Sequence, residues 1–78
     1  MAEYPESAQR RAIEGWVEIE FLVDAEGKVK NVSVLKSGPT RVFDAAAVKA
    51  IRRWEFEPAT RDGQPVDSQE RRRVVFKL

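Results

Sequence analysis

The chain of 78 residues contains no cysteine and no histidine. Without cysteine it has no disulfide bonds and no thiolate metal sites, and without histidine it lacks the commonest general base and metal ligand at neutral pH. No apolar run approaches the roughly 20 residues of a membrane span. Lysine and arginine number 14 against 13 acidic residues, a balance that argues against a general nucleic-acid binder, whose affinity rests on cationic excess. The length suffices for one domain.

The centre of the chain carries apolar residues at the spacing of one helix face. The positions i, i+3, i+4, i+7, i+8 and i+11 are Phe43, Ala46, Ala47, Ala50, Ile51 and Trp54. The alanines between two large aromatics allow this helix to lie close against a flat partner. Thr40 is a candidate N-cap, and Asp44 suits the positive end of the helix dipole. Pro58 ends any continuation, because the residue before a proline leaves the helical region.

A hairpin of two strands precedes this helix. The segment 16–24 alternates in the period of a half-buried strand, and its inward residues are Val17, Ile19, Phe21 and Val23. A tight turn follows, in which Gly27 is available for a left-handed residue. In the return strand, 28–36, the inward residues are Val32 and Val34. Val29 falls out of phase with them, which indicates a bulge or twist near the turn.

The ends of the chain complete the set of elements. Pro5 at a first helical position predicts a short helix over 5–13. After the helix, Phe56 is expected under the sheet, and 61–65 is expected to form a loop. The last strand, 66–78, places on one face Val74, Phe76 and Leu78, and on the other Arg71, Arg73, Val75 and Lys77.

Together these elements predict an α+β domain with a ββαβ core. A right-handed crossover brings the third strand beside the first, so the three-stranded antiparallel sheet has the order 2-1-3, with a short N-terminal helix and one long helix packed on one face. The predicted structural core consists of Val17, Ile19, Phe21, Val23, Val32, Val34, Phe43, Ala46, Ala47, Ala50, Ile51, Trp54, Phe56, Val74 and Phe76.

An ordered series of short motifs runs through almost the whole chain. It comprises Tyr4-Pro5, Val23-Asp24, Gly27-Lys28-Val29, Val34-Leu35-Lys36-Ser37-Gly38, Phe43-Asp44-Ala45-Ala46, Arg52-Arg53-Trp54-Glu55-Phe56-Glu57-Pro58-Ala59 and Asp62-Gly63-Gln64-Pro65-Val66. None of these motifs is specific alone. Their combination resembles the C-terminal domain of TonB energy-transducer proteins, and the resemblance extends from Tyr4 to Leu78.

The resemblance implies that residues 1–78 are a periplasmic domain of an inner-membrane-anchored protein in a Gram-negative bacterium. Such proteins have a membrane helix that joins the ExbB–ExbD proton-driven motor, followed by a Pro-rich linker; both are expected to lie outside this chain. The terminal domain binds the TonB box of outer-membrane transporters for iron-siderophores, cobalamin or similar cargo, and transmits force to them. From the residues themselves we expect no catalysis, no cofactor and no metal site.

The expected binding mechanism is strand addition, in which an extended peptide pairs with the unpaired main chain of an edge strand. The candidate edge is 71–77, flanked by the Tyr4-Pro5 pair of the family motif. The predicted partner-binding residues are Tyr4, Pro5, Arg71, Arg72, Arg73, Val74, Val75 and Lys77. A second interpretation of the arginines stays open, because charges on an edge strand commonly prevent aggregation.

Other functions receive less support. Stacking of RNA bases on the sheet would need outward aromatics among cationic residues, whereas the central strand presents Glu18, Glu20 and Asp24 outward. Glu18 and Glu20 lie about 7 Å apart by strand rise, but without a histidine, a cysteine or a phosphate loop they indicate a solvated face and not an enzyme. A TonB-like domain appended to a sensor or a peptidase is the main alternative. Two edge strands also allow a homodimer by strand or hairpin exchange.

Overall fold

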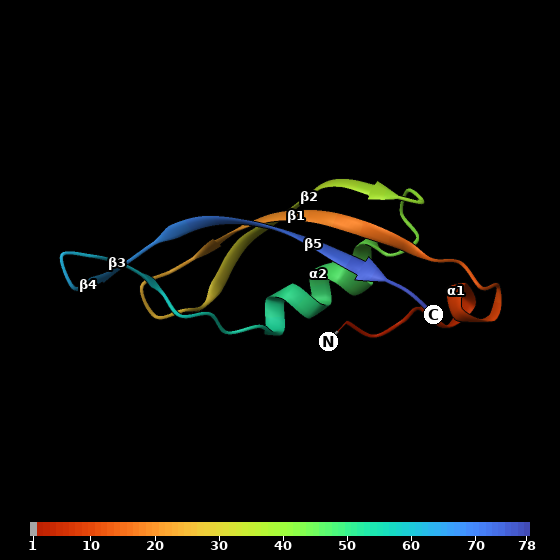
Figure 1. Cartoon of the computed structure of the whole chain (residues 1–78), viewed down its shortest axis with the longest axis horizontal. Coiled ribbons are helices and arrows are strands. Elements are labelled where there is room, and N and C mark those ends of the chain that lie inside the picture. Colours follow the sequence, from red (N-terminus) through yellow and green to blue (C-terminus); the bar gives the residue numbers. More distant parts are fainter. Residues whose placement is uncertain (1) are drawn as a thin grey trace.

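The computed structural model, which describes residues 2–78, consists of two layers (Figure 1). One layer is an elongated, twisted sheet, and the other contains helix α2 and the N-terminal segment. The molecule measures 49 × 19 × 16 Å. In chain order the elements are α1 (Glu6–Arg10), β1 (Gly15–Val23), β2 (Val29–Gly38), α2 (Asp44–Arg53), β3 (Ala59–Arg61), β4 (Gln64–Val66) and β5 (Ser68–Phe76).

The main sheet has the order β2-β1-β5 with antiparallel pairs, which confirms the predicted topology. Strand β1 pairs with β5 without interruption, from Gly15 opposite Phe76 to Val23 opposite Ser68. The β1–β2 pairing is irregular at two places, between Glu18 and Ile19 and between Glu20 and Leu22 on β1. Asn31, on the β2 side of the second irregularity, has φ 53°, so the expected bulge near the turn is confirmed.

The core lies between the sheet and α2. Ten predicted core residues are buried, namely Val17, Ile19, Phe21, Val23, Phe43, Ala47, Ala50, Ile51, Val74 and Phe76. Four more are partly buried against them, namely Val32, Ala46, Trp54 and Phe56. The prediction for Val34 is wrong, because its side chain is 37% exposed. Val34 lies opposite inward-facing Ile19, but β2 is an edge strand, and no further strand of residues 2–78 covers its outer side.

Both helices are shorter than the sequence predicts. Helix α2 begins after Phe43, which takes the N-cap position without a side-chain hydrogen bond, and ends at Trp54, whose ψ of 146° is extended. Thr40 is therefore not the cap; it lies inside a turn that is closed by the N–H of Val42 and the carbonyl of Pro39 and that precedes the helix. Helix α1 covers Glu6–Arg10 with Pro5 as its N-cap, where 5–13 was expected.

The segment expected to be a loop contains a small hairpin. Strands β3 and β4 pair from Ala59 opposite Val66 to Arg61 opposite Gln64. Asp62 and Gly63 form its turn, and both have positive φ, 52° and 79°, as a type I′ turn requires. At the other end of β5, Leu78 lies beyond the strand and is 62% exposed, so its predicted inward position is wrong.

Candidate functional site

Strand β5 has a neighbour on one side only. Strand β1 covers that side along its whole length, and no other strand of residues 2–78 pairs with the opposite side (Figure 1). We refer to this outer edge of residues Ser68–Phe76 as the β5 border. The border contains most of the segment 71–77, which is the predicted partner-binding edge.

Two of the candidate arginines lie on the face of the sheet that α2 does not cover. Arg71 is opposite Glu20 and Arg73 is opposite Glu18, and their ion pairs measure 3.3 and 3.2 Å. Pairs as exposed as these contribute about 0–1 kcal/mol each. Their charges are nevertheless largely balanced within the domain by Glu20 and Glu18, which weakens their attraction for an acidic peptide.

A tryptophan on the same face supports Arg73. The Arg73 guanidinium carbon lies 4.4 Å from the Trp16 ring centroid, a cation–π distance. Trp16 is opposite Gly38 on β2, and a Cβ at Gly38 would lie only 3.0 Å from the indole nitrogen. The missing side chain therefore lets the indole lie across the sheet.

Arg72 lies on the opposite face, across from Ile19. Its Nη1 is 2.9 Å from a Glu70 carboxylate oxygen and donates to the carbonyl oxygen of Arg71 at 3.0 Å. Its guanidinium carbon lies 5.7 Å from the ring centroid of Phe56. No local pattern predicts the contact with Phe56, because this residue comes from a different segment of the chain.

The position of this guanidinium shows which main-chain groups of β5 point outward. On the β1 side of Arg72 the space is filled by Ile19 and Phe21, both fully buried, whereas the Arg72 side chain is 44% exposed. The guanidinium therefore lies on the outer side, and so does the Arg71 carbonyl that it reaches. Because main-chain groups alternate between the two edges of a strand, the N–H and C=O groups of Arg73 and Val75 also face the β5 border.

The remaining candidates lie at the C-terminal end of β5. Val74 is buried opposite Val17, whereas Val75 is 55% exposed. Lys77 is exposed and follows the last residue of the strand. These positions agree with the alternation predicted for this strand.

Tyr4 contacts this end of β5 through the ring of Phe76. Its ring meets Phe43 and Phe76 edge-on at centroid distances of 5.5 and 5.8 Å, and its hydroxyl donates to the carbonyl of Ile13. Burial, with a smaller effect of the Glu14 carboxylate, raises the pKa of the Tyr4 hydroxyl. Of the two predicted partner residues in this segment, Tyr4 thus has a packing role already.

Beside Tyr4, a groove separates the N-terminal segment from α2. It encloses about 760 Å³ and is lined in part by Tyr4, Pro5, Ala46, Ala50 and Trp54. Across it, Arg53 and Glu3 form an exposed ion pair of 3.8 Å. Trp54 therefore packs against the core on one side and borders this groove on the other.

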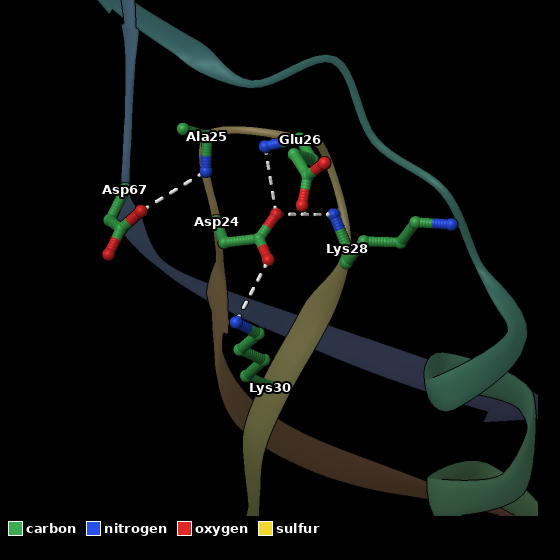
Figure 2. Close-up of polar contacts among 6 residues, drawn as sticks. All are labelled: Asp24, Ala25, Glu26, Lys28, Lys30 and Asp67. Atoms are coloured by element: carbon green, nitrogen blue, oxygen red, sulfur yellow. Dashed lines mark hydrogen bonds and ion pairs between the residues drawn. The ribbon is translucent and has the colours of Figure 1, made fainter.

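At the far end of the sheet, Asp24 organises the β1–β2 turn (Figure 2). Its carboxylate accepts the N–H groups of Glu26 and Lys28 at 2.9 Å each and pairs with Lys30 Nζ at 3.1 Å. The Lys28 N–H, helped by Lys30, lowers the pKa of Asp24, and burial opposes this only in part. Asp24 is 7% exposed, so the expectation that it lies on the outward face is wrong. The strand ends one residue earlier, and the turn folds around the carboxylate.

The fold and the sequence both match known proteins. The chain is 37% identical over 75 residues to Protein TonB of Pseudomonas aeruginosa, a match that covers 96% of this chain and 22% of that protein. It is 43% identical over 75 residues to Protein TonB of Xanthomonas campestris pv. campestris, covering 96% of this chain and 34% of that protein. The chain thus spans no more than about a third of the length of these relatives.

The structural comparison agrees. The solution NMR structure of the Pseudomonas aeruginosa TonB CTD superposes with a TM-score of 0.86 at 36% identity, over 100% of this chain and 79% of that one. Within residues 2–78, no helix is long and apolar enough to cross a membrane. The family model described as "Gram-negative bacterial TonB protein C-terminal" matches residues 2–78, and the chain therefore belongs to the TonB C-terminal domain family.

Proposed function

We propose that this domain binds the TonB box of outer-membrane transporters by adding the box as a further strand at the β5 border. The observation that carries the proposal is the nine-residue strand β5, whose outer side has no partner among residues 2–78. Membership of the TonB family supports the identity of the partner.

Main-chain pairing suits such a role. The outward N–H and C=O groups of Arg71, Arg73 and Val75 can bind any extended peptide, whatever its side chains. One domain could thus serve several transporters. A pull along the strand would load all of these hydrogen bonds together, which suits the transmission of force.

The proposal includes the rest of the parent protein. We expect a membrane anchor in the inner membrane, coupling to ExbB and ExbD, and a periplasmic location for this domain, with no enzymatic activity of its own. An apolar span followed by a Pro-rich tract in the full gene product would support a transducer. A sensor or peptidase domain in that place would instead make this an interaction module of another membrane protein.

Substitution of Val75 by proline tests the β5 border. The outward N–H of Val75 is removed, whereas the pairing with β1 uses the alternate residues of β5, so the fold should persist. In a calorimetric titration with a TonB-box peptide, we expect binding to be lost while the far-UV dichroism is unchanged.

Val75→Thr is the matched control, because it changes the side chain and keeps the N–H. It should bind the peptide as the unaltered domain does. A folded Val75→Pro variant with undiminished affinity would place the binding site elsewhere, for example at the outer edge of β2.

A further inference from the structure

One side chain of the domain already occupies the β5 border. Arg72 Nη1 donates to the outward carbonyl of Arg71, and the same nitrogen is paired with Glu70. The guanidinium lies near the Phe56 ring. We propose that the Arg72 side chain covers this carbonyl and is displaced preferentially by extended peptides that carry a carboxylate beside it. We call this role the selectivity gate; it rests on the proposed strand addition.

The gate follows from the requirements of pairing. A guest strand needs the Arg71 carbonyl as the acceptor for one of its own N–H groups, so the Arg72 guanidinium must leave that oxygen. For a neutral guest peptide this step exchanges one hydrogen bond to the Arg71 carbonyl for another, so it adds little to the free energy of binding. The gate therefore weakens the binding of neutral extended peptides.

A carboxylate on the guest changes this balance. Side chains directly opposite one another on neighbouring strands share a face, with Cβ atoms about 4.5–5.5 Å apart. A guest glutamate opposite Arg72 would thus lie within reach of the displaced guanidinium. Arginine presents five donors in a planar fork, so it can keep Glu70 and bind the new carboxylate in a charge-assisted contact.

The neighbouring arginines cannot take this role. Arg71 and Arg73 project from the other face of the sheet and are held by Glu20 and Glu18 of β1. The acidic partner of Arg72 lies on its own strand, which leaves the outer side of the guanidinium open to a guest.

Two synthetic peptides test the gate. Both alternate valine and threonine, and they differ only in a central glutamate or glutamine. We expect the intact domain to bind the glutamate peptide about fivefold more tightly, the ratio that corresponds to an exposed ion pair. Arg72→Met keeps an unbranched, flexible stem but removes the guanidinium with its charge and donors, so the ratio should fall to about one and the glutamine peptide should bind more tightly than before.

Three controls separate the gate from the strand addition on which it rests. Arg71→Met should keep the preference for the glutamate peptide. Arg72→Lys retains the positive charge without the planar guanidinium, so it should keep part of that preference. In the unbound domain, Arg72→Met should shift the carbonyl carbon resonance of Arg71, because the cap on that oxygen is lost.

Equal binding of both peptides by the intact domain, an unchanged ratio in Arg72→Met, or an unmoved Arg71 carbonyl resonance would each overturn the gate and leave strand addition standing. If the intact domain binds neither these peptides nor a TonB-box peptide, strand addition itself fails, and the gate fails with it.

Discussion

A single methyl group at Gly27 should test how the segment after α2 is attached to the sheet. Gly27 has φ 83°, and a Cβ built on it would lie 2.1 Å from the carbonyl oxygen of Phe56. The Gly27 carbonyl in turn accepts the Phe56 N–H at 3.1 Å. In Gly27→Ala the Phe56 main chain must therefore move away by more than 1 Å to reach an ordinary contact distance.

The expected cost has three parts. The left-handed conformation costs alanine about 1–2 kcal/mol. Displacement of Phe56 breaks its hydrogen bond, which costs about 1 kcal/mol. It also weakens the contact between the Phe56 and Phe21 rings, whose centroids lie 5.3 Å apart, at a further cost of about 1 kcal/mol. The sum is about 3–4 kcal/mol, a large part of the roughly 4–12 kcal/mol expected for a domain of this length.

Gly63→Ala is the matched control, since Gly63 has φ 79° and no atom of the described part of the chain lies within 4 Å of the added methyl group. It should cost only the conformational strain of about 1–2 kcal/mol. Urea denaturation followed by tryptophan fluorescence would give both free energies of unfolding. Equal losses in the two variants would refute the reasoning, because they would show that Phe56 does not press on Gly27.

Two further predictions concern the turn and the core. Because the pKa of Asp24 is lowered in the folded state, its charge stabilises the domain above the unfolded pKa of about 3.9, and this stabilisation is lost as the pH falls through the folded pKa. The difference in urea midpoint between the unaltered domain and Asp24→Asn should therefore shrink from about pH 6 to about pH 3; a constant difference would contradict a role for the charge. Trp54→Ala should cost about 2–3 kcal/mol in the same assay, below the value for a fully buried tryptophan, because one side of the ring borders the groove. A loss under about 1 kcal/mol would show that the ring contributes little to the core.

The strand periodicity and the helix face were sufficient to predict the sheet order and most of the core, because those residues interact through regular spacing. The errors occur where a sheet edge or a local turn decides whether a residue is buried or caps a helix. Val34 has the spacing of a core residue, but it is exposed because no strand of the described part of the chain lies on the outer side of β2. Thr40 has the chemistry of a cap, but the chain makes a separate turn before the helix begins.

The β3–β4 hairpin was missed although its signal was present. Asp62-Gly63 is a strong type I′ pair, but the flanking segments Ala59–Arg61 and Gln64–Val66 are too short and polar to show strand periodicity.

The candidate site was predicted less completely than the fold. The alternation along 71–77 placed the residues on the correct faces, because period 2 is a local property of the strand. The pairing of Arg71 and Arg73 with β1 depends on the strand register, which the sequence leaves open. The contact of Arg72 with Phe56 joins segments separated by the β3–β4 hairpin, and no local pattern reports it.

The contact of Tyr4 with Phe76 has a mechanical consequence. Tyr4 lies close to the N-terminal end of the chain. Its ring contacts Phe76, the last residue of β5, which is the strand that we propose binds the transporter. Tension applied ahead of Tyr4 would thus reach β5 through one aromatic contact, without first stretching the β1–β2 hairpin or unwinding α2. The route between the two points of attachment is short, and a short route stores little of the applied work in deformation of the domain itself.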